Sequence, residues 1–305
     1  MSDIVILGIF AADAAFRAQR LPKMGETLLG DGFALNPGGK GSNQAVAAAR
    51  AGGSVSFLSK IGNDTFAEMA RRTWTDAGVI FAGDVSADQP TGAAFIFLDS
   101  ATGDNAIIVA PGAAGTISAT DVDGWADTIR AARVFVCQLE QPLDAAEHGL
   151  RIARDAGVRT VLNPAPAADL TDSMLSLCDL ITPNESEAEL LTGIAVDGPA
   201  TAKDAARALI ARGVGAVVVT LGAQGAYYHD GSDGVHIAGR SAGDVVETTG
   251  AGDAFNGALA VALAEGRDMN AALDFANACA AISVTRAGAA PAMPDRSEID
   301  ALLLR

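Results

Sequence analysis

The stretch ETTGAGDAFNGALAVALAEG, residues 247–266, decides the interpretation of this chain. Its first part contains only small residues, so the backbone can approach a ligand, and a 14-residue helical pattern begins near Asp253. A glycine-rich turn before a helix presents unpaired N–H groups at the positive end of the helix dipole, which suits an anion. A carboxylate in such a site makes sense if Asp253 handles a proton while the N–H groups hold a phosphoryl group. The alternative is an ordinary turn with Asp253 as the N-cap, and this stretch alone favours neither.

The composition fits one large α/β domain or two small ones. The chain has 305 residues, of which 50% are hydrophobic and only 5% aromatic, so its core must consist of Ala, Val, Leu and Ile. The formal net charge of −16 argues against nucleic acid or an anionic membrane as a partner. If the ligand carries phosphates, local N–H groups and metal ions must offset this repulsive field.

The cysteines indicate a reducing compartment. Cys137, Cys178 and Cys279 are too far apart for a zinc knuckle, and their odd number gives no disulfide framework. The first residues, MSDIVILGIF, run directly into a strand without a signal-peptide pattern. The longest uncharged stretch, residues 275–285, is shorter than the roughly 20 residues that span a bilayer. We therefore expect a cytoplasmic protein without a membrane partner.

Strands alternating with helices predict a mostly parallel sheet with helices packed against it. The expected strands are residues 4–10, 55–60, 79–81, 134–139, 160–162, 180–182 and 216–220, followed by a hairpin near 225–235. The expected helices are residues 44–51, 65–77, 121–131, 143–156, 185–191 and 202–212.

Two segments interrupt this alternation. Residues 14–36 have no helical period, and residues 91–99 and 105–110 are predicted to form a β-hairpin around a turn at 101–104. Together they would form a small separate sheet, or else edge strands that extend the main one. Since no linker breaks the chain, we expect a single domain, 1–305, with a small β-sheet lid formed by about residues 14–36 and 91–110.

Polar residues gather where the predicted strands end. They are Asp13, Glu140, Asn163, Asn184 and Thr220. In open α/β sheets ligands bind at the carboxyl ends of the strands. Any one of these residues could be a turn or cap residue, but together they predict a pocket. A second glycine-rich stretch, NPGGKGSN at 36–43, precedes a helix that Ser42 or Asn43 is expected to cap.

The two commonest nucleotide-binding motifs are absent. Residues 36–43 do not fit the P-loop pattern, and Phe255 stands where GxGxxG would need its third glycine. His148, His229 and His236 lie away from the strand ends, so a carboxylate must do any acid–base work. Phosphoryl transfer fits these residues, because it depends on positioning and charge stabilisation more than on covalent chemistry.

The chain resembles the ribokinase-like (PfkB-type) carbohydrate kinases. Residues 36–53 match the first signature of that family, and residues 247–259 match the second, with GAGD intact at 250–253. Further matches are NPAPA at 163–167, TPNESE at 182–187, TLGAQG at 220–225 and TRAGAAP at 285–291. The resemblance covers essentially the whole chain. It implies a three-layer α/β/α fold with a mostly parallel sheet and a small β-sheet lid.

The resemblance also implies an activity. The expected reaction is ATP-dependent phosphorylation of the primary hydroxyl of a pentose, D-ribose to D-ribose 5-phosphate. The alternative within the family is a kinase for another furanose, such as deoxyribose or a nucleoside, or for another carbohydrate. ATP is the implied co-substrate, with Mg²⁺ and K⁺ as cofactors, and the lid is the implied surface of a homodimer. A sugar-binding sensor on the same fold would not need Asp253, and a dinucleotide-dependent oxidoreductase would need the missing fingerprint.

The family pattern implies a role for each matched position. Asp253 would be the base, and the backbone of Gly250, Ala251, Gly252 and Asp253 would form the anion hole. The implied sugar-binding residues are Asp13, Gly39, Lys40, Asn43, Glu140 and Asp253. The implied ATP-binding residues are Asn184, Thr220, Gly222, Gly225, Gly252 and Asn277. The implied metal-binding residues are Glu187, which would hold Mg²⁺ through water, and Glu247, Thr249, Ser283, Arg286, Gly288 and Ala292, which would hold a monovalent cation largely through their backbone.

Three positions depart from the family pattern. Ala11 stands where an Asn usually touches a ribose hydroxyl, which weakens the assignment to ribose. Glu247 replaces an Asp at the cation site, and Ala292 replaces a Ser there, which weakens the expected potassium requirement. None of the three belongs to the phosphoryl-transfer residues.

Overall fold

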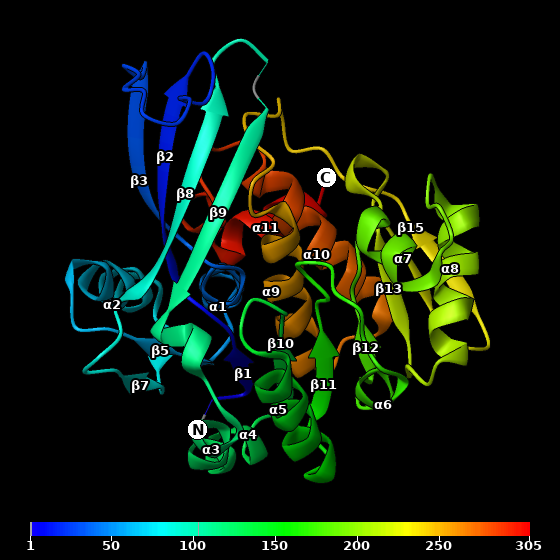
Figure 1. Ribbon diagram of the computed structural model, residues 1–305. Helices are drawn as coiled ribbons and strands as arrows, with labels where there is room; N and C mark the ends of the chain where they lie inside the picture. The colour runs from blue at the N-terminus through cyan, green and yellow to red at the C-terminus, as the bar shows by residue number, and fades with distance from the viewer. Residues whose placement is uncertain (1, 103) are drawn as a thin grey trace.

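The main feature of the computed structural model, which describes residues 2–102 and 104–305, is a nine-stranded sheet (Figure 1). Its strand order is β15-β14-β13-β12-β11-β10-β1-β4-β6, and its antiparallel pairs are β13–β14 and β14–β15. The strands are β1 (Ile4–Leu7), β4 (Val55–Leu58), β6 (Ile80–Phe81), β10 (Val134–Cys137), β11 (Arg159–Leu162), β12 (Leu180–Ile181), β13 (Val217–Thr220), β14 (Ala226–His229) and β15 (Gly234–Ile237). Two short strands, β5 (Lys60–Ile61) and β7 (Asp84–Val85), form a separate parallel pair.

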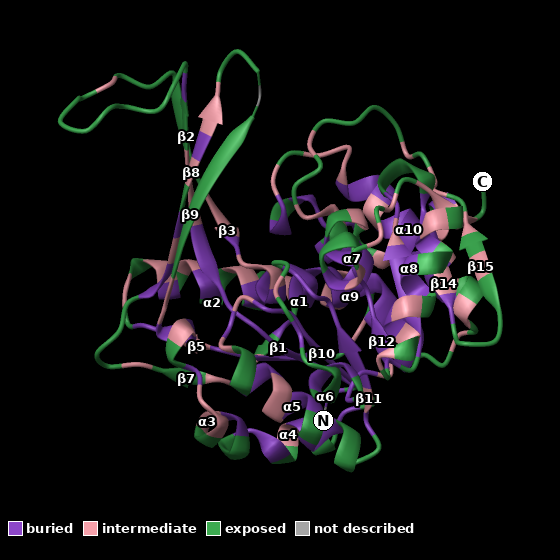
Figure 2. Cartoon of the chain, turned by 45° about the vertical axis from the view of Figure 1, so that its right-hand side comes forward, coloured by how far each residue is buried: buried purple, intermediate pink, exposed green. Residues whose placement is uncertain are grey.

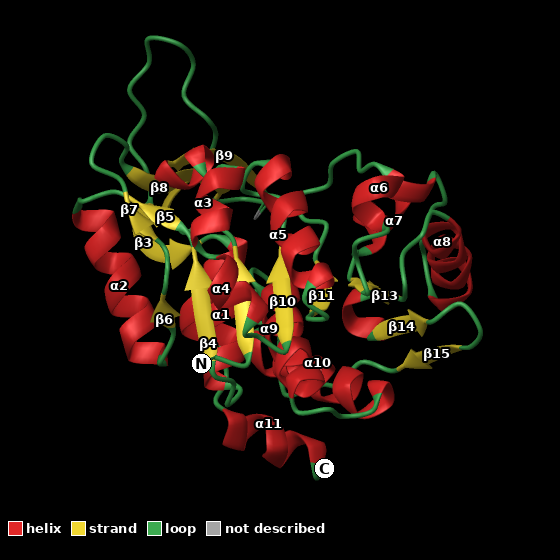
Figure 3. Cartoon of the chain, turned by 90° about the horizontal axis from the view of Figure 1, so that it is seen from below, coloured by secondary structure: helices red, strands yellow, loops and turns green. Residues whose placement is uncertain are grey.

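Helices cover both faces of this sheet, as Figure 3 shows. One layer consists of α1 (Lys40–Arg50), α2 (Thr65–Ala77), α9 (Ala251–Ala264), α10 (Met269–Ser283) and α11 (Arg296–Leu303). The other consists of α3 (Ala119–Gly124), α4 (Ala126–Arg130), α5 (Leu143–Asp155), α6 (Asp172–Leu175), α7 (Glu185–Thr192) and α8 (Pro199–Ala211). Three 3₁₀ turns, η1 (Ala113–Thr116), η2 (Gly222–Gln224) and η3 (Ala290–Ala292), connect other elements.

The strands are apolar on both faces because both are buried. In β1, Ile4 and Ile6 pack with the first layer of helices, whereas Val5 and Leu7 pack with the second. Helix α9 is buried almost all round, because Ala and Gly let α1 and α10 pack closely against it. The three-layer α/β/α class that the sequence predicts is confirmed.

A second, four-stranded sheet extends from one end of the main body (Figure 1). Its order is β3-β2-β8-β9, with β2 (Ala11–Ala18), β3 (Gly32–Gly38), β8 (Thr91–Asp99) and β9 (Asn105–Gly112). Much of it is exposed or half-buried, in contrast to the buried, purple central strands of the main sheet (Figure 2). The predicted small separate sheet is therefore present. The turn expected at 101–104 contains Gly103, which lies outside the described residues.

Several predicted boundaries are wrong. The first strand ends at Leu7 rather than at residue 10, and the chain then enters β2 of the small sheet. The helix expected at 121–131 is divided at Trp125, whose φ of −99° and ψ of 1° interrupt the helical backbone.

Helix α1 begins at Lys40 rather than Gln44. Its N-cap is Gly39, and Ser42 and Asn43 lie inside the helix, so neither caps it. The added turn forms because the Glu140 carboxylate, following β10, accepts the backbone N–H of Lys40 at 2.7 Å and satisfies one of the free donors of the first turn. A partner so distant in sequence cannot be read from the local pattern.

Across residues 2–102 and 104–305, every helix lacks either the length or the apolar character needed to cross a lipid bilayer.

Candidate active site

Asp253 lies in the first turn of α9. The N-cap is Gly250, in the left-handed region at φ 78°, where an added Cβ would meet the Ala289 Cβ at 2.8 Å. The interpretation of Asp253 as an N-cap is therefore wrong. The N–H of Ala251 donates to Thr248 O at 3.2 Å, whereas those of Gly252 and Asp253 donate to no backbone carbonyl among the described residues.

The Asp253 carboxylate is held by two amide side chains from α1. Asn43 Nδ2 donates to Asp253 Oδ2 at 3.0 Å, and Gln44 Nε2 donates to Asp253 Oδ1 at 3.1 Å. Asp253 is only 8% exposed. Burial raises its pKa, while Lys40 and the hydrogen bonds from Asn43 and Gln44 oppose that rise. The carboxylate is thus oriented and is made more basic than a solvated Asp.

A cavity of about 170 Å³ opens beside Asp253 at the carboxyl edge of the sheet. It is lined by Lys40, Asn163, Ala165, Thr182, Asn184, Glu187, Thr220, Gly250, Gly252, Asp253 and Asn256. Two larger open hollows, of about 760 and 630 Å³, lie beside α11 and between β15 and α10, and neither contains a residue of the expected site. The cavity therefore joins the helix start of residues 247–266 to the polar residues predicted at three strand ends.

The Lys40 side chain provides positive charge beside the cavity. Burial lowers its pKa, but the surrounding carboxylates of Asp253, Glu140, Glu187 and Asp13 outweigh that effect and raise it. Four acidic side chains around one ammonium group leave the site short of positive charge. A triphosphate would need the N–H groups of α9 and a metal ion to bind here.

The two carboxylates of the expected sugar side have raised pKa values. Burial raises the pKa of Glu140 to about 7, against the lowering effect of Lys40. Burial and the charge of Asp253 raise the pKa of Asp13 to about 6, again opposed by Lys40. Carboxylates with raised pKa values thus cluster beside Asp253, and such clusters are common in functional sites.

Asp13 reaches this cluster from the small sheet. It lies on β2, paired with Asn36 of β3 and Ala94 of β8, so the expectation that a main-sheet strand delivers it is wrong. Gly39, between β3 and α1, has a φ of 87°, and an added Cβ would lie 2.5 Å from the Ile9 carbonyl. Only glycine fits this close approach of two chain segments.

The expected ATP-binding residues divide into two groups. Asn184, Thr220 and Gly252 line the cavity, and Asn184 caps α7 in a reciprocal pair with Glu187. Gly222 and Gly225 flank η2, directly after β13, and Asn277 lies on α10. Asn277 Nδ2 points at the carbonyls of Ile237 and Ala238, at 3.4 and 3.3 Å. Asn277 thus contacts the end of β15 and the residue that follows it, and it does not line the cavity.

The expected cation-site residues lie where the segment before α9 meets the turn after α10. Glu247 Oε2 accepts the Gly288 N–H at 2.8 Å, and the N–H groups of Val246 and Glu247 donate to Val284 O. Among the described residues, the carbonyls of Thr249 and Gly288 accept no backbone hydrogen bond.

The other three cation-site residues have local partners. The Ser283 carbonyl accepts the Arg286 N–H at 3.2 Å, the Arg286 side chain pairs with Glu298, and Ala292 is buried in η3. Within residues 2–102 and 104–305, no three His, Cys, Asp or Glu side chains are grouped as a metal site.

Three buried amides of the site were not predicted from the sequence: Gln44, Gln138 and Asn256. Gln44 Nε2 contacts both Asp253 Oδ1 and Asn163 Oδ1, and Gln44 Oε1 accepts from Gln138 Nε2. Gln44 and Asn256 are buried amides on helices whose other buried residues are mostly small or apolar. A polar residue in such a helix is the signal that could have identified them, because buried amides need partners.

Fold and site together define a phosphotransferase of the α/β class. A buried carboxylate lies in the first turn of a helix, on the carboxyl edge of a mostly parallel sheet, beside a lysine. The sequence profile of the pfkB family carbohydrate kinases matches residues 1–296, and the chain belongs to this family. It is a carbohydrate kinase, a phosphotransferase with an alcohol group as acceptor.

Known relatives resemble the chain over nearly its full length. It is 39% identical to the ribokinase of Haemophilus influenzae, with 97% of this chain and 96% of that protein covered. It is 35% identical to the deoxyribokinase of Salmonella typhi, with 99% and 98% covered. The solved structure of Arabidopsis thaliana ribokinase complexed with ribose and ATP is similar at a TM-score of 0.93 and 31% identity, with 99% and 98% covered.

Proposed function

We propose that the protein transfers the γ-phosphoryl group of ATP to the primary hydroxyl of D-ribose, giving D-ribose 5-phosphate. The observation that carries this proposal is the Asp253 carboxylate, which is oriented by Asn43 and Gln44. It lies beside N–H groups of α9 that donate to no backbone carbonyl in the described part of the chain. The names of the relatives support the substrate, as does the Arabidopsis structure that holds ribose and ATP.

In this proposal Asp253 takes the proton from the attacking hydroxyl. Its raised pKa makes it a better base, and a loose transition state lets the proton leave late. The N–H groups of Gly252 and Asp253 hold the transferring phosphoryl group, with Gly250 and Ala251 completing the turn. Backbone and side chain of one helical turn thus perform different parts of the reaction.

The two substrates would approach Asp253 from opposite sides. Asp13, Gly39, Lys40, Asn43 and Glu140 surround the sugar, since they gather where β2, α1 and the end of β10 meet. ATP lies across the ends of β12 and β13. There its binding residues are Asn184, Thr220, Gly222, Gly225 and Gly252, and Asn277 lies near the adenine.

The residues present fit the two metal ions that the family implies. Glu187 lines the cavity together with Asn184, and a single carboxylate that acts through water suits Mg²⁺ bound mainly by phosphates. The carbonyls of Thr249 and Gly288, which accept no backbone hydrogen bond within the described part of the chain, suit a monovalent cation, with Glu247, Ser283, Arg286 and Ala292 around them. Mg²⁺ would neutralise phosphate charge, which Lys40 alone cannot do among four carboxylates.

Deoxyribose is the second candidate substrate. Ala11 lies at the start of β2, on the same face as Asp13, and offers no hydrogen bond to a sugar hydroxyl. A deoxyribokinase is also among the relatives. A sugar that lacks the corresponding hydroxyl would therefore lose no hydrogen bond at this position.

We also propose that the small sheet is a lid and that it pairs with a second copy of the chain. The strand register places Phe16, Phe33, Phe95 and Ile108 on one face, while Asp13 lies on the other, toward the site. These four side chains are 38% to 69% exposed. An apolar cluster of this kind favours a protein interface. The three buried free cysteines fit the proposed cytoplasmic location.

The experiment is a coupled assay of ADP formation with ATP, Mg²⁺ and a panel of pentoses and nucleosides. We expect ribose to be the preferred acceptor, and Asp253→Asn to lose at least about 100-fold in kcat. Asp123→Asn, in an exposed pair with His148, is the matched control and should keep full activity. No ADP with any acceptor would contradict the kinase, and deoxyribose as the better acceptor would select the second candidate.

A further inference from the structure

A chain of buried side-chain amides ends on the Asp253 carboxylate. Gln138, which follows β10, donates from Nε2 to Gln44 Oε1 at 2.6 Å. Gln44 in turn donates from Nε2 to Asp253 Oδ1 at 3.1 Å and to Asn163 Oδ1 at 3.0 Å. Gln44 and Gln138 are both completely buried. Hydrogen bonds between such groups are strong because water cannot compete for them.

The direction of these hydrogen bonds is fixed by the backbone. Asn163 Nδ2 donates to the carbonyl of Thr182 at 3.1 Å, and a carbonyl can only accept. Asn163 must therefore present its oxygen to Gln44, and Gln44 must present its NH₂ group to both Asn163 and Asp253. The opposite amide orientation would leave two oxygens facing each other.

A second branch reaches the same turn of α9. Thr182 Oγ1 donates to Asn256 Oδ1 at 2.6 Å, and Asn256 Nδ2 donates to the Gly252 carbonyl at 2.8 Å. The network thus holds Asp253 by its side chain and Gly252 by its backbone. The second branch starts at Thr182, directly after β12. The same loop carries Asn184, on the proposed nucleotide side.

We propose that Gln44 is a positioning residue for the general base. Its amide, oriented by Gln138 and Asn163, keeps the Asp253 carboxylate ionised and directed toward the acceptor hydroxyl. Gln44 itself is buried behind the carboxylate and is not among the residues that line the cavity. The inference rests on the proposed function, in which Asp253 removes the proton.

Other charges also act on Asp253, and the test must separate them from Gln44. Lys40 of α1 stabilises the carboxylate, whereas Asp13 of β2, Glu140 after β10 and Glu187 of α7 are coupled to it by repulsion. All four remain when Gln44 is replaced. Loss of the amide donor alone must then raise the pKa of Asp253, because Gln44 bonds to the charged form.

Gln44→Met tests the proposal, because methionine keeps the length and much of the volume but donates no hydrogen bond. We expect kcat to fall by about 10- to 100-fold, because the carboxylate is no longer held toward the acceptor hydroxyl and a small displacement of a reacting group has an effect of this size. KM for sugar and for ATP should change little, since Gln44 contacts neither. The acid limb of kcat against pH should move to higher pH.

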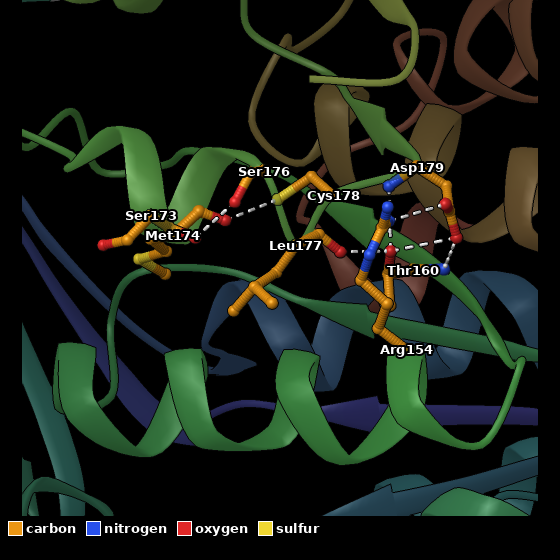
Figure 4. Close-up of polar contacts among 8 residues, drawn as sticks. All are labelled: Arg154, Thr160, Ser173, Met174, Ser176, Leu177, Cys178 and Asp179. Atoms are coloured by element: carbon orange, nitrogen blue, oxygen red, sulfur yellow. Dashed lines mark hydrogen bonds and ion pairs between the residues drawn. The ribbon is translucent and has the colours of Figure 1, made fainter. Parts of the chain in front are cut away.

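The matched control is Thr160→Val, near the start of β11, whereas Asn163 follows the end of that strand. Figure 4 shows Thr160 with its partners Leu177 and Asp179. Thr160 Oγ1 donates to Leu177 O at 2.7 Å and accepts the Asp179 N–H at 2.8 Å, so its loss also leaves buried partners unpaired. The control should lose stability and keep the kcat and pH profile of the wild type. If Gln44 has only a structural role, Gln44→Met should also lose stability and keep the kcat and pH profile of the wild type.

Gln44→Glu provides a second, nearly isosteric variant should methionine prevent folding. Its acidic side chain shares a proton with Asp253, so the acid limb should move further toward high pH than in Gln44→Met. Wild-type kcat and pH profile in the folded Gln44 variants would overturn the proposal. The Asp253 pKa can also be followed directly by ¹³C NMR, with Asp253→Asn to assign the signal. That measurement keeps the test valid even if the wild type phosphorylates no sugar, because that outcome contradicts only the proposed function. An unchanged Asp253 pKa in Gln44→Met would overturn the proposed role of Gln44.

Discussion

Glu140 Oε2 accepts the backbone N–H of Lys40 at 2.7 Å, which joins the end of β10 to the first turn of α1. The bond replaces the side-chain cap that α1 lacks, since its N-cap is Gly39. The carboxylate is largely buried, which raises its pKa from 4.5 to about 7. The site therefore holds, in the absence of sugar, a carboxylate that is costly to ionise.

This cost predicts a pH-dependent stability. Between pH 4.5 and about 7 the folded protein binds a proton at Glu140 that the unfolded chain releases. The free energy of unfolding must therefore fall as pH rises through this window. In Glu140→Gln this contribution to the slope is absent, and the amide oxygen can still accept the Lys40 N–H. We expect the stability of Glu140→Gln relative to the wild type to grow from pH 4.5 to 7 and then level off, measured by urea unfolding of the sugar-free protein.

Glu147→Gln is the control for that series, because Glu147 forms a surface pair with Arg151. It should follow the wild-type slope. A difference between Glu140→Gln and the wild type that does not change with pH would show that Glu140 is already ionised throughout the window. The KM for sugar should rise in Glu140→Gln, since the carboxylate is proposed to accept a sugar hydroxyl.

The local parts of the site were predictable from the sequence. A glycine-rich turn followed by an apolar helical pattern identifies the start of α9, because both signals lie within residues 247–266. The polar residues after β11 and β12 and at the end of β13 were also placed on one edge, since parallel strands share that edge. Each of these inferences depends on neighbours in the chain.

The long-range parts were not predictable in the same way. Asp13 was assigned to the end of the first strand, but the chain leaves the main sheet after Leu7 and carries Asp13 on β2. The start of α1 depends on Glu140, and the orientation of Gln44 depends on Asn163. Such contacts arise from tertiary packing, which overrides local propensity.

A second prediction concerns sugar choice. Ala11 is buried at the start of β2, between Gly38 and Gly92. Ala11→Asn adds one hydrogen-bonding group on the face that carries Asp13. A neutral hydrogen bond contributes about 0.5–1.5 kcal/mol, so kcat/KM for ribose relative to deoxyribose should rise about 2- to 10-fold. The ratio is measured with both sugars at saturating ATP.

Ala11→Ser controls for added volume and polarity with a shorter reach. It should change the ratio less than Ala11→Asn. An equal loss of activity with both sugars in Ala11→Asn would mean that this position has no room for a polar side chain and does not determine sugar preference.

A third prediction concerns the monovalent cation. Glu247→Gln keeps an oxygen that can accept the Gly288 N–H but removes the negative charge. If that charge helps to bind the cation, the K⁺ concentration for half-maximal activity should rise about 3- to 30-fold, while kcat at saturating K⁺ stays near the wild-type value. The measurement is kcat against KCl concentration at constant ionic strength. An unchanged K⁺ response would restrict Glu247 to anchoring the turn at Gly288.

The last prediction concerns the exposed face of the small sheet. Phe16 contacts both Phe33 and Phe95, at centroid distances of 4.9 and 5.8 Å, and Ile108 is paired with Phe95 in the register. Phe33→Asp with Ile108→Asp places two charges in this cluster, and burying them between two copies would be strongly unfavourable. Light scattering after gel filtration should show a dimer for the wild type and a monomer for the double variant. Leu190→Asp, at an exposed position of α7, is the control and should remain dimeric. If the wild type and the double variant have the same molecular mass in solution, this face is excluded as the interface. A higher sugar KM in the monomeric variant would show that the second copy helps to hold the lid over Asp13.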